Sequence, residues 1–367
     1  MPKNKTFKLF QETQPVRGFL RSIIYDLGRG TYHFIPNEML AFIQEIDNKG
    51  ASPKKYPIEY LEFLLNNEII FEVEAKEIAM FPKLELIYDE PNLIHSLSVE
   101  IDFSTDKSRQ KLGNILTLFG CKSLQLIFVN KFEIEKVENL LNDLNNSRLN
   151  SIEIVAQYDS SIEFKKLIEL QNRYQRLDNI ILYQGYENSI LHSEGHLKNI
   201  IMTSKGLEYQ QFISAEHFTL NPTFFSEAQH YNTFFNRRLF IDSKGKIKNS
   251  QNNSNNFGIY EGDIKKLKEV VASDTFQKIW FSSKIKTDIC KDCEFRFMCF
   301  DNRIPLQRSD KTWYHTTECS YNPYIAKWTG EEDYKTLSEC GIYSDAEGFR
   351  MDEEKVGQIN TELWGED

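Results

Sequence analysis

Apolar runs alternate with helical patterns through the middle of the chain. Five of these runs predict strands, at 93–102, 123–130, 151–158, 177–184 and 200–204. The segments between them place apolar residues at helical spacing, as in SIEFKKLIELQNRY at 161–174. Strand starts recur about every 27 to 28 residues, which is the spacing of β/α units in a parallel sheet. The pattern predicts an α/β fold in which residues 90–226 form a partial (β/α) barrel.

The first 75 residues have a different pattern. The β-prone runs RSIIYD (21–26) and TYHF (31–34) flank LGRG, whose two glycines suit a tight hairpin turn. Two helical patterns follow, the first beginning at Pro36, and EIIFEV (68–73) then predicts another strand. A hairpin, short helices and a strand in this order predict a winged-helix-like module over residues 1–75.

The C-terminal third has two parts of different composition. Residues 227–330 begin with a strand–turn–strand pattern that has Gly245 in the turn. Residues 331–367 hold 12 acidic and 3 basic side chains, so this acidic extension carries −9 of the net charge of −10. Two interpretations remain open for it: a solvated, weakly ordered extension, or an electrostatic contact for a basic partner. The remaining charge gives no basic face, which argues against nucleic-acid binding.

Four of the six cysteines gather near the C-terminus, at Cys290, Cys293, Cys299 and Cys319. No signal peptide and no membrane-spanning run is evident, so the cytoplasm, where thiols stay reduced, is the expected compartment. Clustered cysteines in that setting indicate a metal site, either structural zinc or an iron–sulfur cluster, and spacing alone does not decide between them. The alternative is a set of unliganded thiols.

The CX2CX5C run, the later cysteine and the strand–turn–strand around Gly245 together resemble a SPASM domain. Such domains end many radical S-adenosylmethionine enzymes that modify ribosomally made peptides, and they bind two auxiliary [4Fe-4S] clusters. The resemblance implies that the four clustered cysteines ligate the second cluster. Ligands of the first are replaced, with Ser250 and Arg303 at two cysteine positions and His230 or a neighbour at a third. One [4Fe-4S] cluster is therefore implied, with zinc as the alternative.

Radical chemistry lacks its own ligands in this sequence. Radical S-adenosylmethionine enzymes carry CX3CX2C after their first barrel strand, whereas FSTDKSRQK (103–111) contains no cysteine. Cys121 stands alone and is interpreted as a buried small apolar residue. We therefore expect no S-adenosylmethionine and no radical activity, and we assign no catalytic residue.

Longer phrases resemble one subset of the SPASM family more closely. FFNRRLFIDSKGKIKNS (234–250), FGIYEGDI (257–264) and ICKDCEFRFMC (289–299) are similar to the SPASM proteins of grasp-with-spasm systems. VRGFLRSIIYDLGRGTYHFIPNEML (16–40) is also similar to that subset. Those proteins are encoded beside an ATP-grasp ligase and a precursor peptide, in which the ligase forms ester or amide rings to give a graspetide.

Within this resemblance, residues 1–75 are similar in layout to a RiPP recognition element, which binds the leader of a precursor peptide as an added strand. Tyr32 and Phe34 on the candidate edge strand, with Leu61 and Leu65 on the candidate groove helix, are the predicted peptide contacts. The alternative for each is an ordinary core position.

These expectations lead to three hypotheses. In the first, the protein is an accessory factor that binds the leader, holds one structural [4Fe-4S] cluster and presents the peptide to an ATP-grasp ligase. In the second, it is an iron–sulfur enzyme that acts on the precursor directly. In the third, the same four cysteines hold zinc in a binding scaffold. Whether the chain is an enzyme in its own right stays open, and no nucleic acid or membrane partner is expected.

Overall fold

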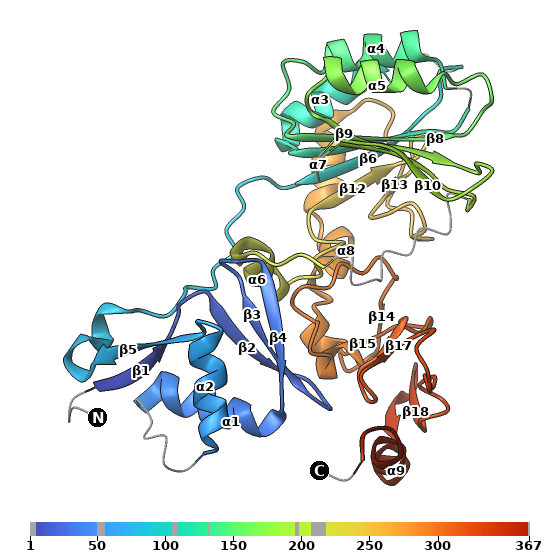
Figure 1. Ribbon diagram of the computed structural model, residues 1–367. Coiled ribbons are helices and arrows are strands. Elements are labelled where there is room, and N and C mark those ends of the chain that lie inside the picture. Colours follow the sequence, from blue (N-terminus) through green and yellow to red (C-terminus); the bar gives the residue numbers. More distant parts are fainter. Residues whose placement is uncertain are drawn as a thin grey trace. The chain divides into compact units, whose positions relative to one another are not determined.

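The computed structural model describes residues 5–49, 56–104, 109–130, 132–194, 198–206 and 218–365. The chain divides into two compact units, whose elements are labelled in Figure 1. The first unit comprises residues 1–88, 212–233 and 281–367, and the second comprises 89–211 and 234–280. The region 227–330, which the sequence pattern groups together, therefore contributes to both units. In the described residues, no helix is long and apolar enough to span a membrane.

An eight-stranded sheet forms the second unit, in the order β10-β11-β9-β8-β7-β6-β12-β13. Its strands are β6 (Ser96–Ile101), β7 (Ser123–Phe128), β8 (Ser151–Gln157), β9 (Leu177–Tyr183), β10 (Ser189–Glu194), β11 (Lys198–Met202), β12 (Arg238–Ile241) and β13 (Ile247–Lys248). Neighbours from β11 to β12 run parallel, and the two outermost strands are antiparallel to their neighbours. The predicted α/β class is confirmed. Between described residues, β10 and β13 do not pair, so this sheet is open.

Helices α4 and α5 lie along one face of that sheet (Figure 1). The helices of the unit are α3 (Arg109–Phe119), α4 (Ile134–Asp143), α5 (Phe164–Arg173), α7 (Ile264–Ala272) and α8 (Asp274–Gln277). Helices α4 and α5 bury residues at helical spacing, Leu140 and Leu167 among them. Alternate strand residues such as Leu124 and Ile154 are fully buried, as expected for the inner positions of a covered sheet.

The N-terminal part of the first unit contains two small antiparallel sheets. Its strands are β1 (Lys5–Leu9), β2 (Thr13–Arg17), β3 (Ser22–Asp26), β4 (Thr31–Ile35) and β5 (Ile70–Glu74). Strands β2, β3 and β4 form one sheet with β4 at its edge, while β1 pairs with β5. Its helices are α1 (Asn37–Lys49), α2 (Ile58–Asn66) and the 3-10 helix η2 (Ala75–Met80). The predicted hairpin, two helices and later strand are all present, while β1 and β2 were not predicted.

The rest of the first unit consists of short elements. They are α6 (Pro222–Ala228), η5 (Lys278–Phe281), which begins in the second unit, η6 (Lys284–Lys286), η7 (Cys290–Asp292), β14 (Leu306–Gln307), β15 (Trp313–Tyr314), β16 (Tyr321–Asn322), β17 (Lys327–Trp328), β18 (Ile342–Asp345), β19 (Gly348–Met351) and α9 (Glu353–Trp364). Of the two interpretations of the acidic extension, the weakly ordered one does not fit this structure, and the contact with a basic partner stays a prediction. Strands β18 and β19 form a hairpin, and Ile342, Val356 and Ile359 pack with Tyr324 and Ile325 in one buried cluster. Apolar positions among the acidic ones therefore anchor this segment in a core that it shares with Tyr324 and Ile325.

Candidate metal centre

The four clustered cysteines lie in the first unit, in a stretch with little regular structure. Cys290 begins η7, and the Cys293 backbone N–H donates to the Cys290 carbonyl at 3.1 Å. Just before this turn, Ile289 has a φ of 66°, in the left-handed region that β-branched residues rarely adopt. Such backbone costs roughly 1–3 kcal/mol and persists only where the surroundings impose it. This tight turn brings the backbones of two cysteines three positions apart close together.

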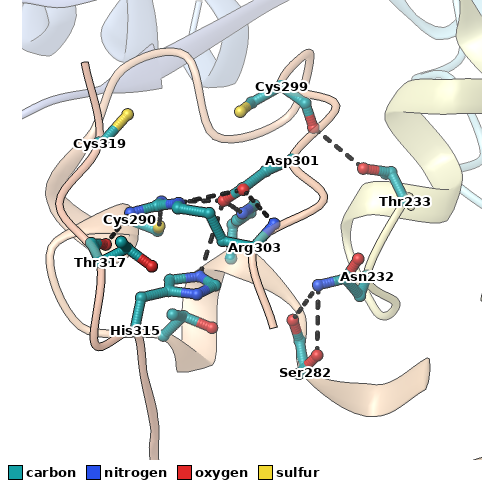
Figure 2. A network of polar contacts seen from close by, with 12 residues as sticks. Asn232, Thr233, Ser282, Cys290, Cys299, Asp301, Arg303, His315, Thr317 and Cys319 are labelled. Carbon is teal, nitrogen blue, oxygen red and sulfur yellow. Dashed lines mark hydrogen bonds and ion pairs between the residues drawn. The ribbon is translucent and has the colours of Figure 1, made fainter. Parts of the chain in front are cut away.

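Hydrogen bonds to neighbouring segments position the other two cysteines. The Cys299 carbonyl accepts from Thr233 Oγ1 at 3.0 Å, and Cys319 Sγ accepts from the Tyr321 backbone N–H at 3.4 Å. Figure 2 shows Cys290, Cys299 and Cys319 around the side chain of Arg303. All six cysteines of the chain are described, and none forms a disulfide. The predicted four are thus available as thiols, which is the form that binds a metal after losing its proton.

The thiols lie close enough for their charges to act on one another. Burial raises the pKa of Cys293 well above the usual range of a thiol, and thiolate charges on Cys299, Cys319 and Cys290 would raise it further. Burial also raises the pKa of Cys299 and of Cys319. Without a metal these thiols stay protonated at neutral pH. A metal ion must therefore displace protons on binding, as thiolate sites do.

Soft or borderline metals fit this donor set best. Four thiolates are the ligands of tetrahedral zinc and of [4Fe-4S] clusters, and all four of these thiols are free and half-buried. In the described residues no three of their sulfur atoms lie within 4.8 Å of one another. Cys121 lies apart from them in the second unit, where it is 1% exposed, and burial raises its pKa to about 12. It has the environment of a buried apolar residue. Part of the cysteine-free segment after β6, residues 105–108, falls outside the described residues.

A buried group of charged side chains lies beside the thiols (Figure 2). Asp301 is at its centre and pairs with both the Lys284 ammonium and the Arg303 guanidinium. Arg303 Nη2 and Nε donate to the Asp301 carboxylate at 2.9 and 3.1 Å, and Nη1 donates to the Thr317 carbonyl at 2.7 Å. The side chains of Lys284, Asp301 and Arg303 are 3%, 1% and 5% exposed. We define these three residues as the buried charge cluster.

Electrostatics keep all three members of the buried charge cluster ionised. Burial alone would raise the pKa of Asp301, but Arg303 and Lys284 outweigh it and hold that pKa well below its usual range. Burial would lower the pKa of Lys284, yet the Asp301 carboxylate raises it above its usual value. Two cations and one carboxylate leave one net positive charge next to the thiols. Sequence reasoning missed Lys284 and Asp301, and considered Arg303 only as a replaced cysteine.

His315 adds a further donor at the edge of this cluster. Its side chain is 6% exposed, and Nε2 lies 3.6 Å from Asp301 Oδ2. Burial and the nearby Arg303 lower the pKa of His315 well below its usual range, so the ring is neutral. Ligand atoms of Cys290, Asp301 and His315 lie within 4.8 Å of one another, a group that could hold a metal ion. Because Asp301 is already paired with two cations, the four thiols are the better donor set.

A cavity of about 240 Å³ opens beside the same thiols. Its lining includes Cys290, Arg303, His315 and Cys319, together with Tyr343 and Ser344 of β18. Cys293 is not among the lining residues, and it packs, as Cys319 also does, against the aromatic core of the unit. The site is therefore asymmetric, with Cys290 and Cys319 facing the cavity.

The predicted peptide contacts divide between two environments. Tyr32 and Phe34 on β4 are 36% and 40% exposed, whereas Leu61 on α2 is 4% exposed and Leu65 is 39% exposed. Leu61 belongs to the core cluster that includes Ile35. Successive side chains of a strand point to opposite faces, so Tyr32 and Phe34 point away from the face that Ile35 presents to this core. The structure thus brings the two aromatic residues together but does not bring Leu61 into a shared groove with them.

We call residues 290–319, which contain the four cysteines, the thiol stretch. Phe295 of this stretch packs against β4. The Phe295 ring lies 6.2 Å from that of Tyr32 and 5.8 Å from that of Phe34, between ring centroids. Next to it, Glu294 is buried and accepts from Arg21 Nε at 2.8 Å. A methyl group at Gly18 would lie 2.4 Å from the Arg21 carbonyl oxygen and 2.9 Å from Glu294 Cβ, so the β2–β3 turn needs glycine there. The edge strand β4 and the thiol stretch therefore share one packed interface.

Comparisons with known proteins give little beyond this geometry. No protein-family model matches the chain, and no curated protein matches it. Among solved structures, a crystal structure of Streptococcus suis SuiB is 11% identical and covers 80% of this chain and 94% of its own, with a TM-score of 0.28. A crystal structure of SuiB bound to S-adenosylmethionine is 12% identical with the same coverage and TM-score. Because this TM-score is low, neither similarity supports an argument here.

Proposed function

We propose that this protein is an accessory factor in the maturation of a ribosomally synthesised peptide. In this proposal the β2–β3–β4 sheet of a RiPP recognition element-like module binds the leader of the precursor, and a SPASM-like stretch holds one [4Fe-4S] cluster. The protein then presents the precursor to an ATP-grasp ligase, as in grasp-with-spasm systems. The sequence resemblance suggests this pathway, and the packing between β4 and the thiol stretch supports it.

The edge position of β4 carries the proposal. An edge strand has unpaired backbone N–H and C=O groups, to which an extended peptide adds by hydrogen bonds. Two aromatic side chains, Tyr32 and Phe34, stand partly exposed at alternate positions of this strand. Backbone pairing gives affinity to such a complex, and alternate side chains give it specificity.

The metal has a structural role in this proposal. Cys290, Cys293, Cys299 and Cys319 would hold it, and a bound cluster or zinc ion would cross-link a stretch with few regular elements of its own. That stretch carries Phe295, which packs against Tyr32 and Phe34. Metal binding would thereby keep β4 in the conformation that accepts the leader.

A leader-binding assay tests the proposal. The probe is a fluorescent synthetic leader of the precursor encoded beside the gene, and the readout is its anisotropy with the full-length protein. Phe34→Ala should weaken binding about tenfold or more, since buried aromatic contacts dominate peptide interfaces. Phe81→Ala is the matched control, because Phe81 is 41% exposed against 40% for Phe34 but lies after η2. No leader binding by the wild type, or equal losses in both variants, would refute the proposal.

The cavity favours a second candidate function, an iron–sulfur enzyme that acts on the precursor directly. A space of about 240 Å³ beside Cys290 and Cys319 could admit a small part of a peptide. Four closed thiolate ligands argue against this, because an iron that reacts with substrate needs an open position. Incubating the loaded protein with the precursor, without a ligase, and measuring peptide mass distinguishes the two. A changed mass supports the enzyme, and an unchanged mass supports the accessory role.

A further inference from the structure

Position 303 is where the SPASM pattern has a cysteine and this chain has an arginine. This arginine is not on the surface. Its side chain is 5% exposed, and its Nη2 lies 3.9 Å from Cys290 Sγ, within the longer range of hydrogen bonds to sulfur. A buried guanidinium therefore faces the first cysteine of the remaining thiol set.

The partners of Arg303 fix its direction. Asp301 accepts two hydrogen bonds from the side chain, at 2.9 and 3.1 Å, and the Thr317 carbonyl accepts a third at 2.7 Å. A planar guanidinium held by three hydrogen bonds to two partners cannot rotate away from the sulfur. Figure 2 shows the resulting arrangement, with Arg303 between Cys290, Cys319 and Asp301. The guanidinium is therefore oriented so that Nη2 donates toward Cys290 Sγ.

The negative charge of a metal bound by four thiolates explains why a cation lies beside it. A divalent ion with four thiolates carries two net negative charges, as does an oxidised [4Fe-4S] cluster with the same ligands, and burying them is costly. The buried charge cluster supplies one net positive charge, since Lys284 and Arg303 outnumber Asp301. Asp301 in turn keeps both cations in place when no metal is bound, and so limits the cost of burying them.

We infer that Arg303 is a positioning residue of the metal centre, which compensates the charge of the thiolates and donates a hydrogen bond to Cys290 Sγ. This inference rests on the metal site of the proposed function. It adds a role for the residue at position 303. Where the SPASM pattern has a thiolate ligand of the first cluster, this chain has a cation that stabilises the other metal centre. Outer-shell partners of this kind typically change metal affinity about 10- to 100-fold.

Cobalt(II) binding tests the inference, since cobalt(II) reports thiolate ligation by its charge-transfer absorption. The full-length protein is freed of metal without oxygen and titrated with cobalt(II) against a competing chelator. Arg303→Gln should weaken cobalt binding at least about tenfold. It should also shift the thiolate-to-cobalt band to longer wavelength, because the sulfur loses a hydrogen bond that stabilises its lone pair. Arg303→Lys should show a smaller loss, since it keeps the charge but not the reach to both Asp301 and Cys290 Sγ.

Arg308 provides the matched control. Its side chain is 7% exposed and pairs with Asp288 at 2.7 Å, and among the described residues it makes no hydrogen bond to a cysteine sulfur. Arg308→Gln removes an equally buried guanidinium and should leave cobalt affinity within about twofold and the band unmoved. If Arg303→Gln does not fold, Arg303→Lys and Arg308→Lys carry the same comparison.

The outcomes separate the inference from the proposed function. Wild-type protein that shows no thiolate-to-cobalt band has no metal site of this kind, and the proposed metal centre fails. If both Arg303 variants bind cobalt as tightly as the wild type does, the metal centre stands and the inference is overturned. Equal losses at Arg303 and Arg308 also overturn it, because they would reflect general destabilisation.

Discussion

Truncation of Phe295 tests the contact between the thiol stretch and the edge strand. The side chain is 3% exposed. Its ring is within contact range of five other rings, those of Tyr32, Phe34, Phe218, Tyr321 and Trp328, at centroid distances of 4.8–6.2 Å. Replacing a buried Phe by Ala costs about 3–5 kcal/mol, through lost transfer free energy and the cavity left behind. The crowded aromatic surroundings put Phe295→Ala in the upper half of this range, since edge-to-face pairs add about 0.5–1.5 kcal/mol.

Two assays measure the consequences. Urea denaturation gives the free energy of unfolding, which we expect to fall by about 4 kcal/mol, and a thermal melt should show a decrease of roughly 10 °C. Leader anisotropy gives the functional effect. Tyr32 and Phe34 lose the ring that supports them, so we expect leader affinity to fall about tenfold even under conditions where the variant is fully folded.

Phe276→Ala is the control for this experiment. Phe276 is fully buried and lies in the second unit, so the same truncation should cost a similar amount of stability without touching β4. Its leader affinity should equal that of the wild type. If Phe295→Ala costs less than about 1 kcal/mol, the packed interface is not as described. If it binds the leader normally, the interface does not matter for binding.

Three further predictions concern single side chains. Cys319→Ser should lose bound metal, measured by metal analysis and absorption, whereas Cys121→Ser in the second unit should retain it. Asp301→Asn should lower the free energy of unfolding by about 3–5 kcal/mol in urea, because two buried cations lose their partner, and a loss under 1 kcal/mol would contradict the ion-pair geometry. Burial raises the pKa of Glu153 on β8, so the unfolded state loses its proton first and stability should decline as pH rises from about 4.5 through the folded pKa. A Glu153→Gln variant should lack that decline in denaturation curves taken across this range.

The parallel sheet was predictable because its strands are locally distinct. Each of β6 to β9 is an apolar run with buried residues, and β6, β7 and β8 are each followed by a helix with an apolar stripe. The place of β12 was not predictable in this way. It pairs in parallel with β6, more than 130 residues earlier in the chain, and nothing in the local sequence specifies such a partner. Strands β1 and β2 were missed because KTFKL and TQPVR are short and polar, and the second contains a proline.

Only the cysteines of the candidate site were predictable, because their residue type alone indicates metal binding. Cysteine spacing pointed to Cys290, Cys293, Cys299 and Cys319, and the charges of the other three would act on the Cys293 thiol; that they hold a metal stays a prediction. Lys284 and Asp301 are ordinary charged residues in the sequence, and only burial turns them into a specific ion pair. The stretch 284–303 is rich in charged residues, so no local signal distinguishes these two. Leu61 shows the opposite limit: a helical apolar position does not reveal which side of the helix is core.

Metal binding and leader binding should be coupled if the thiol stretch supports β4. A metal that orders the segment around Phe295 favours the conformation in which Tyr32 and Phe34 are held, and a bound leader favours the same conformation. Thermodynamic linkage requires the two effects to be equal, so a metal that raises leader affinity by some factor must itself bind more tightly by that factor when the leader is present. Coupling of about 5- to 150-fold is typical of such systems. We would measure leader affinity with and without metal, and then metal affinity with and without leader, on the same preparation. Equal factors well above one support a structural metal that serves peptide recognition. A leader that binds the metal-free protein unchanged would separate the two sites and leave the metal with a role in stability alone.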